Sequence, residues 1–257
     1  MPAESTRAAS TESIRQALER SGLQPGLEHP CSYLTGQPAR NLAFAASNVP
    51  PGLYHGLMEL NFRRSGSIFY RPQCRHCQQC RALRVNVDAF RPNRVQRRCW
   101  RRNRDVAVEV DVPRATEEKH QLYRAYLTRC HDREMDDSWD GFTDFLYHSP
   151  LETIEVVYHL GGRPVAAGIL DVEPETASTV YCYFDPDLRR RSLGTFNVLW
   201  TIDYCRRRRF EYLYLGYYIR DCGKMSYKAG FRPLEAWNGR DWQRFGPGQP
   251  LEIVHGR

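Results

Sequence analysis

The sequence predicts an α+β fold: a mixed, mostly antiparallel sheet, preceded by a small Cys-rich α+β domain. Two observations support this. After residue 105, segments that alternate apolar and polar residues, as strands do, are interleaved with segments whose apolar residues recur every three or four positions, as in helices. Before residue 105 lies a cluster of closely spaced cysteines. With 257 residues, 41% apolar and 26% charged, the chain can build one large core or two smaller ones.

The first part of the chain divides into a tail and a compact segment. Residues 1–28 are polar and are expected to form a flexible tail with one short helix over 11–20, ended by Gly22. Residues 29–104 are expected to form the Cys/Arg-rich N-terminal domain, with helices at 54–62 and 93–103 and strands at 67–70 and 83–87. Pro92, Asn93 and Gln96 have the spacing of a capping box at the second helix.

Residues 105–257 are expected to form the second domain. The predicted strands lie at 106–112, 152–160, 164–172, 178–184, 211–215, 231–237 and 242–245, and three of the four predicted helices lie at 117–129, 192–207 and 223–229. The element order, β, α, α, β, β, β, α, β, α, β, β, resembles that of GNAT-type acyltransferases, so we expect a GNAT-like domain whose sheet opens between its fourth and fifth strands.

Two local features fit the same resemblance. Arg-Arg-Arg-Ser-Leu-Gly at 189–194 precedes a helix, where this fold places a loop whose backbone N–H groups meet a phosphate. Tyr-Lys-Ala-Gly-Phe at 227–231 matches the helix end of the same fold, with Gly230 as the helix stop. The alternative interpretations are a solvated turn and an ordinary helix cap.

The positive charge is concentrated in one part of the chain. The net charge is +7, and only three of the 37 basic residues are lysines. Residues 61–104 contain 13 arginines and a single acid, Asp88, so the rest of the chain is mildly acidic. This distribution predicts a polyanionic partner.

No apolar segment approaches the roughly 18 residues that span a bilayer, and the N-terminus lacks an apolar signal core, so a cytoplasmic protein without membrane contact is expected. The nine cysteines should then be reduced. Four of them, Cys31, Cys74, Cys77 and Cys80, have a spacing that suits zinc or an iron-sulfur cluster. The alternative is that these thiols pack the small domain or line a binding pocket.

Several motifs together identify a family resemblance. They are His-Pro-Cys-Ser-Tyr-Leu at 29–34, Phe-Arg-Arg-Ser-Gly at 62–66, Tyr-Arg-Pro-Gln-Cys at 70–74, Gln-Arg-Arg at 96–98, Arg-Arg-Asn at 101–103, Tyr-Leu-Gly-Tyr-Tyr-Ile at 214–219, Lys-Met-Ser-Tyr-Lys at 224–228 and Phe-Arg-Pro-Leu-Glu at 231–235. From about residue 29 to 242 the chain resembles the aminoacyl-tRNA protein transferases of the N-degron pathway. These comprise eukaryotic arginyltransferases and bacterial leucyltransferases.

The resemblance implies an aminoacyltransferase that moves leucine from leucyl-tRNA to proteins with N-terminal Asp or Glu, which marks them for degradation. The compact length and the Cys-x2-Cys-x2-Cys spacing favour leucyl over arginyl transfer. The alternatives are an arginyltransferase, a non-catalytic RNA-binding protein, and an acetyltransferase, which the imperfect phosphate loop disfavours. The aminoacyl ester is already activated, so the chemistry requires no cofactor.

The same resemblance suggests roles for individual residues. By analogy with acyltransferases, a backbone N–H of 179–184 would face the carbonyl oxygen, and Tyr181 or Tyr183 would relay a proton to the ribose hydroxyl, unless both only pack the sheet. Lys224 is a further catalytic candidate. A cation should bind the acceptor carboxylate. The substrate-binding candidates are Arg63, Arg64, Tyr70, Arg71, Tyr227 and Lys228.

The predicted helix at 93–103 is the main candidate for tRNA binding. Its arginines recur at three- and four-residue spacing and should form one cationic face, with Val95 and Cys99 turned inward. The alternative is a solvated face filled with arginine by codon bias. The tRNA-binding candidates are Arg94, Arg97, Arg98, Arg101, Arg102, Arg189, Arg190 and Arg191.

Overall fold

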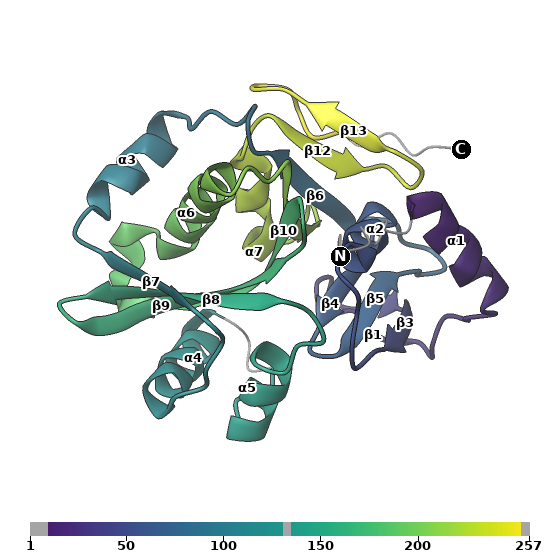
Figure 1. Cartoon of the computed structure of the whole chain (residues 1–257), viewed down its shortest axis with the longest axis horizontal. Helices are drawn as coiled ribbons and strands as arrows, with labels where there is room; N and C mark the ends of the chain where they lie inside the picture. Colours follow the sequence, from purple (N-terminus) through teal and green to yellow (C-terminus); the bar gives the residue numbers. More distant parts are fainter. Residues whose placement is uncertain (1–9, 131–134, 253–257) are drawn as a thin grey trace, which may run out of the picture.

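The computed structural model describes residues 10–130 and 135–252. Its centre is an eight-stranded sheet in the order β13-β12-β6-β11-β10-β9-β8-β7, beside which lies a three-stranded sheet in the order β3-β5-β4 (Figure 1). All neighbouring strands of the large sheet are antiparallel except β10 and β11. The predicted α+β class with a mixed, mostly antiparallel sheet is therefore confirmed.

The strands are β1 His29–Pro30, β2 Pro38–Ala39, β3 Asn41–Ala45, β4 Arg63–Ser65, β5 Ile68–Pro72, β6 Arg81–Asn86, β7 Ala107–Asp111, β8 Thr153–Leu160, β9 Arg163–Val172, β10 Thr176–Phe184, β11 Tyr212–Tyr218, β12 Leu234–Trp237 and β13 Trp242–Phe245. The helices are α1 Thr11–Arg20, α2 Leu53–Glu59, α3 Arg94–Arg102, α4 Glu117–Cys130, α5 Trp139–Leu146, α6 Leu193–Arg207 and α7 Gly223–Ser226, with 3₁₀ turns η1 Pro186–Arg191 and η2 Tyr227–Gly230. From β7 onward the element order is the predicted one.

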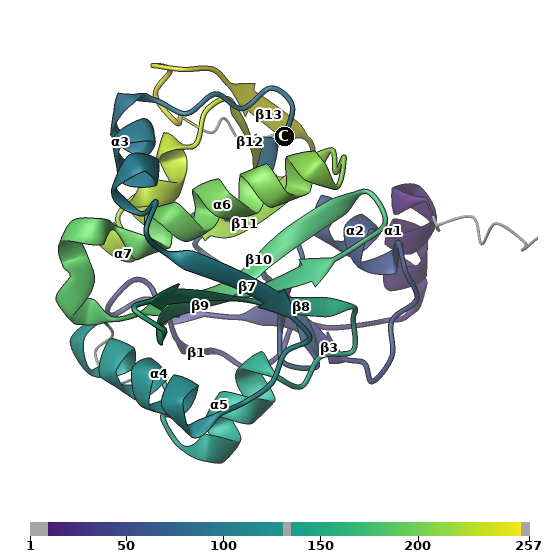
Figure 2. The same cartoon turned by 60° about the vertical axis from the view of Figure 1, so that its left-hand side comes forward.

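Helices cover both faces of the large sheet. In Figure 2, α6 crosses one face while α4 and α5 cover the other. Under α6 the core contains Phe196 and Leu199 packed with strand residues such as Val156. Under α4 and α5 it contains Phe142, Leu146 and Tyr183. Because each helix buries its apolar side on this sheet, the backbone of β10 is held rigidly between two packed layers.

The helix with the predicted capping box forms as expected. Asn93 caps α3 through a hydrogen bond from the Gln96 N–H, and the Gln96 side chain accepts from the Asn93 N–H. One detail of the prediction is wrong. Val95 points outward with 74% of its surface exposed, and Gln96 is buried in its place together with Cys99. The Gln96 amide donates to the Gly230 carbonyl, which explains why a polar residue occupies the inner face.

The division of the chain differs from the predicted one. Strand β6 belongs to the large sheet, where it pairs with β11 and β12, so the predicted boundary at residue 104 falls inside a continuous architecture. Helix α1 also packs on α2, with Ile14 buried in the same core as Tyr54 and Met58. Part of the predicted tail, residues 11–20, is therefore attached to the small sheet.

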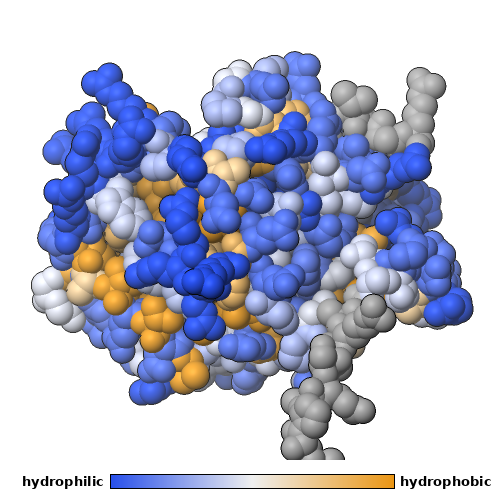
Figure 3. Space-filling model, turned by 45° about the horizontal axis from the view of Figure 1, so that its top comes forward, coloured by the Kyte–Doolittle hydropathy of each residue, from blue (hydrophilic) through white to orange (hydrophobic). Residues whose placement is uncertain are grey.

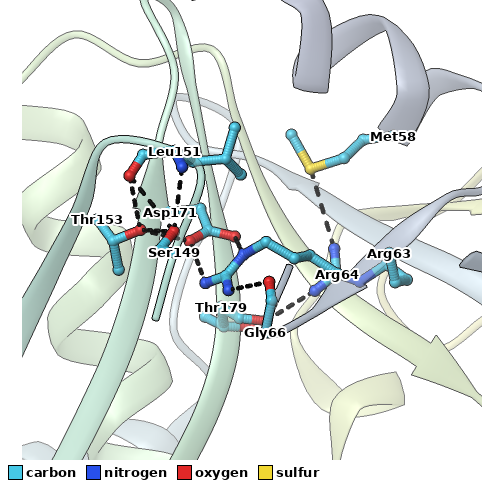
Figure 4. A network of polar contacts seen from close by, with 9 residues as sticks. All are labelled: Met58, Arg63, Arg64, Gly66, Ser149, Leu151, Thr153, Asp171 and Thr179. Carbon is cyan, nitrogen blue, oxygen red and sulfur yellow. Dashed lines mark hydrogen bonds and ion pairs between the residues drawn. The ribbon is translucent and has the colours of Figure 1, made fainter. Parts of the chain in front are cut away.

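One buried ion pair joins the small sheet to the large one (Figure 4). Arg64 of β4 donates from Nε and Nη2 to the two carboxylate oxygens of Asp171 in β9, at 2.8 and 2.6 Å. Both side chains are fully buried. The remaining contacts are also satisfied, since Arg64 donates to the Gly66 carbonyl and Thr153 donates to Asp171. The two sheets are thereby locked in a fixed relation.

None of the helices in residues 10–130 and 135–252 is long and apolar enough to cross a membrane.

We predict that Asp171→Asn lowers the free energy of unfolding by about 3–5 kcal/mol, because it leaves the Arg64 guanidinium buried without a counter-charge. Urea unfolding followed by circular dichroism measures the change. The control is Asp241→Asn, which removes an exposed partner of Arg240 and should cost less than about 1 kcal/mol. Equal decreases in the two variants would contradict a joining role for the buried pair.

Candidate functional site

The large sheet opens between its two parallel neighbours. Strands β10 and β11 pair over three positions, ending at Ser178 and Tyr214. Beyond that point β10 continues to pair with β9, and β11 with β6. Each strand also bulges there, β10 between Thr179 and Tyr181 and β11 between Tyr214 and Gly216. Because a bulge bends and twists its strand, two facing bulges separate the strands and leave backbone groups without a ladder partner.

Gly216 makes room for two cations at this opening. Its φ of +79° favours glycine. A Cβ built on it would lie 3.3 Å from Nζ of Lys228 and 3.4 Å from Nη2 of Arg63. The two side chains arrive from distant parts of the sequence, Arg63 from β4 of the small sheet and Lys228 from η2. They therefore converge on one point of the large sheet.

Arg63 is held rigidly in the opening. Only 5% of its surface is exposed, and its Nη2 donates to the Thr179 carbonyl at 2.7 Å, while Nη1 approaches Sδ of Met58 at 4.0 Å (Figure 4). Thr179 is the last residue of β10 before the bulge, and it lies beyond the positions that pair with β11. The Arg63 guanidinium therefore donates to a carbonyl that has no partner in β11. Within the described residues, the remaining N–H groups of the fork donate to no other protein group.

Lys228 is partly buried and is held by two contacts. Its Nζ donates to the Tyr217 carbonyl at 3.0 Å and lies 3.3 Å from Sδ of Met225. Burial, and then the neighbouring Arg63, lower the pKa of Lys228 to about 7, while Cys222 acts in the opposite direction. The amine therefore exchanges a proton near neutral pH, which a guanidinium cannot do.

The two cations lack a counter-charge. Within residues 10–130 and 135–252, no carboxylate lies at ion-pair distance from either Arg63 or Lys228. Keeping charged groups away from water without a partner costs several kcal/mol unless a ligand supplies the opposite charge. The opening is thus suited to bind an anionic group next to backbone donors of β10.

The other substrate-binding candidates have different environments. Arg64 is excluded because its side chain is fully buried against Asp171, so this prediction is wrong. Arg71 donates to the Leu60 carbonyl at 3.4 Å and lies 5.0 Å from the Phe62 ring. Tyr70 packs on the Tyr217 ring and flanks Arg63 as a supporting residue. Tyr227, 45% exposed beside Phe231, stays a prediction.

The catalytic candidates are divided by burial. Tyr183 is fully buried and its hydroxyl lies 3.0 Å from the hydroxyl of Tyr147, so it cannot reach a ribose, and its predicted role is wrong. Tyr181 packs on Phe145 and contacts Sδ of Met135 at 3.6 Å, and burial raises the pKa of its hydroxyl. Its role as a relay stays a prediction. Lys224 is exposed on α7 and also stays a prediction.

The arginine candidates form one surface. Arg94, Arg97, Arg98 and Arg101 are exposed on α3. Two contacts join α3 to η1, because Arg102 donates to the Arg190 carbonyl and Asn103 donates to the Arg191 carbonyl at 2.9 Å. Figure 3 shows strongly hydrophilic residues over the same corner of the molecule as α3. We call the exposed arginines of α3 and η1 the α3 surface.

Arg191 has a structural task at the edge of the α3 surface. Its guanidinium bonds both carboxylate oxygens of Asp105 at 2.8 Å, so it is less available to a phosphate than predicted. Arg189 and Arg190 remain exposed in front of α6. Ser192, which caps α6, makes no side-chain capping bond, so the first N–H groups of α6 are not satisfied by it.

The four cysteines do not support the predicted metal site. Among the described residues, no group of three or more His, Cys, Asp or Glu side chains is arranged to hold a metal ion. Burial, followed by the neighbouring thiols of Cys31, Cys74 and Cys77, raises the pKa of Cys80 to about 12, so the four thiols lie near one another. Cys74 instead approaches the Arg40 carbonyl at 3.8 Å. We therefore derive no step through zinc or an iron-sulfur cluster.

Sequence reasoning missed Gly216 and the paired bulges. A glycine inside an apolar strand indicates a bulge or a close approach of other groups, so Gly216 carried a usable signal. The bulge at Val180 has no such signal, because valine fits an ordinary strand position equally well.

Two family models match successive parts of the chain. Residues 29–98 match the arginine-tRNA-protein transferase N terminus, and residues 118–238 match the C terminus of the same family. The chain is similar to a GCN5-related N-acetyltransferase structure from Kribbella flavida at 16% identity and a TM-score of 0.37, over 93% of this chain and 75% of that one.

Curated relatives share a larger part of the sequence. The aspartate/glutamate leucyltransferase of Chromobacterium violaceum is 39% identical over 84% of this chain and 90% of its own length. Those of Pseudomonas paraeruginosa and Stenotrophomonas maltophilia are 41% and 40% identical, over 83% and 85% of this chain and 92% and 90% of their own lengths. With both halves matched in the same order along most of its length, the chain belongs to the arginine-tRNA-protein transferase family.

Proposed function

We propose that this protein transfers leucine from leucyl-tRNA to the α-amino group of proteins that begin with Asp or Glu, and so creates a destabilising N-terminus. The observation that carries the proposal is the pair of cations without a carboxylate, Arg63 and Lys228, at the opening of β10 and β11. An acceptor whose first residue is acidic needs a cation of this kind beside the point of transfer.

The acceptor carboxylate is placed on Arg63. Its guanidinium is fixed by the Thr179 carbonyl, so little rotamer freedom is lost when a ligand binds. A hydrogen bond to a charged group contributes about 1.5–3 kcal/mol. The absence of an ion-pair partner among the described residues means that no internal carboxylate has to be displaced first.

The surroundings of the opening favour leucine over arginine as the transferred residue. The charged groups that face the Cys130 thiol at the end of α4 are Arg189, Lys224 and Arg129. Cys130 in turn faces Tyr181 of β10. Arg129 is already paired with Asp187, but Arg189 would repel a guanidinium on the donor, whereas an isobutyl side chain carries no charge and can pack against apolar groups.

The tRNA is placed on the α3 surface. Several exposed guanidinium groups on one helix repel one another, and phosphates relieve that repulsion. Because α3 and η1 are joined by hydrogen bonds, a phosphodiester backbone that follows α3 would arrive at the start of α6, where Gly194 lies against Phe184 at the end of β10. That path delivers the aminoacylated 3′ end to β10.

The chemistry is attack of a neutral amine on an ester. The N-terminal amine has a pKa of roughly 7.7–8.0, so deprotonating it at pH 7 costs only about 1 kcal/mol. The larger contribution comes from holding amine and ester in contact, and from backbone N–H groups of β10 that face the developing oxyanion. The amine nitrogen forms the amide bond, the ester C–O bond breaks, and the ribose oxygen takes up one proton.

We predict that purified protein transfers radiolabelled leucine from leucyl-tRNA to peptides beginning with Asp or Glu, and not to otherwise identical peptides beginning with Lys, Arg or Ala. Single-turnover assays with leucyl-, arginyl- and phenylalanyl-tRNA measure this. Equal or faster transfer from arginyl-tRNA would contradict the leucyl assignment. Tight tRNA binding without any transfer would favour the alternative of a non-catalytic RNA-binding protein.

We predict that Arg63→Met lowers kcat/KM for an Asp-initiated peptide by about 10- to 100-fold, because one charged hydrogen-bond partner of the carboxylate is removed. The Asn-initiated peptide, which has nearly the same shape without the charge, is the matched control. The preference for Asp over Asn should shrink in the variant. An unchanged preference would place the carboxylate elsewhere.

For the α3 surface, Arg97→Ala/Arg101→Ala should reduce the slope of tRNA affinity against salt concentration, on logarithmic scales, by about 0.7–0.9 for each phosphate that the variant no longer binds, equally for all tRNAs. Affinity measured from low to high salt gives the slope. The control is Arg15→Ala/Arg20→Ala on α1, which removes the same charge at the far side of the molecule (Figure 1). Equal slopes in both double variants would mean that tRNA docks away from α3.

A further inference from the structure

Arg63 and Lys228 at the opening differ in their ability to lose a proton, and this difference is not needed to bind an anion. Arg63 is always charged, whereas Lys228 can lose its proton. A neutral lysine amine has two N–H groups and one lone pair. The structure supplies two acceptors to Nζ, the Tyr217 carbonyl and Sδ of Met225. When both N–H groups of the neutral amine donate to these acceptors, the lone pair of Nζ points in a third direction and can accept a proton.

The position of Nζ also fits the first residue of an acceptor. Lys228 Nζ and Arg63 Nη2 lie 3.3 and 3.4 Å from one point, the place of a Cβ on Gly216. In Asp or Glu the α-amino nitrogen is separated from its side-chain carboxyl carbon by only three or four bonds. When the carboxylate sits on Arg63, the α-amino group of the same residue is therefore within reach of Lys228.

The charged and titratable groups that face Lys228 are Arg63 from β4 and Cys222, which precedes α7. Neither of these groups is a carboxylate. Within the described parts of the chain, no carboxylate therefore holds Lys228 in its protonated form. An N-terminal Asp brings one carboxylate and one ammonium, whose opposite charges largely cancel at Nζ. The lysine thus stays able to give and take a proton while the acceptor is bound.

We propose that Lys228 is the proton acceptor for the incoming α-ammonium group, and that Arg63 alone binds the carboxylate. The ammonium gives one proton to the Nζ lone pair, and the nitrogen pair so released attacks the ester carbonyl. As the ester C–O bond breaks, the ribose oxygen takes up a proton, which the Nζ ammonium can supply. The second proton that leaves the attacking nitrogen goes to water, so one proton is released for each amide formed.

This inference rests on the proposed function. The experiment is designed so that failure of the inference and failure of the proposed function give different results. The measurement is the single-turnover rate of leucine transfer to a saturating Asp-initiated peptide from pH 5.5 to 8.5, for wild type, Lys228→Arg and Lys228→Met. Lys228→Arg keeps the charge but cannot accept a proton. Thermal melts and tRNA affinity verify that each variant folds, and Lys228→Arg serves if Lys228→Met does not.

For wild type we expect the rate to rise tenfold per pH unit and to bend near pH 7, because protonated Lys228 cannot act as a base. Both variants should be about 100-fold slower at pH 7, with the bend moved to roughly 7.7–8.0, the pKa of the peptide amine itself. A tertiary amine such as N-methylmorpholine, which accepts a proton but forms no amide, should restore part of the rate in Lys228→Met.

Three results would overturn the inference. If Lys228→Arg keeps a rate within threefold of wild type, positive charge is sufficient and Lys228 is only a ligand of the carboxylate. A bend that stays near pH 7 in both variants would assign the titration to another group. Failure of the wild-type protein to leucylate the Asp-initiated peptide would overturn the proposed function itself, whatever the variants do.

Discussion

The buried ion pair between Arg64 and Asp171 is the contact on which the rest of the site depends. It fixes β4 of the small sheet against β9 of the large one, at 2.6 and 2.8 Å and without contact with water. Neighbouring residues in a strand point to opposite faces. Once Arg64 is committed to Asp171, Arg63 must point the other way, toward β10. The position of one cation at the opening is therefore set by the ion pair of the next residue.

The opening forms because β10 and β11 pair over only part of their length. A parallel pair of only three positions, followed by facing bulges, is a weak piece of sheet that would not persist alone. It is held apart because helices pack on both faces, and because Arg63 occupies the Thr179 carbonyl that a strand partner would otherwise use. In the proposed function, the space between the separated strands is where the ester and the amine meet.

The cationic side chains of the described residues differ in whether a carboxylate of the protein is their partner. Structural arginines have carboxylate partners, as Arg64 has Asp171, Arg84 has Glu235 and Arg191 has Asp105. Arg63 and Lys228 lack such partners in the described residues, and the exposed arginines of α3 face solvent. Charges without an internal partner are the ones a ligand can use, because binding them does not first break an ion pair. In the proposed function, the cations at the opening bind an acidic N-terminus and those of the α3 surface bind tRNA.

The sequence by itself determined the family, the element order from β7 onward, the capping box of α3 and the concentration of arginine in residues 61–104. These properties are local or compositional, and neighbouring residues suffice to specify them. Only the tertiary structure decided which of Arg63 and Arg64 faces the opening, that Tyr183 is a packing residue, and that Lys228 and Gly216 share one point. For the two arginines the answer depends on partners more than a hundred positions away, Asp171 and Thr179, and for Tyr183 it depends on Tyr147 in another element, so no local pattern can reveal it. The physical reason is that burial and charge pairing are properties of contacts between segments, whereas helix and strand periodicity is a property of a single segment.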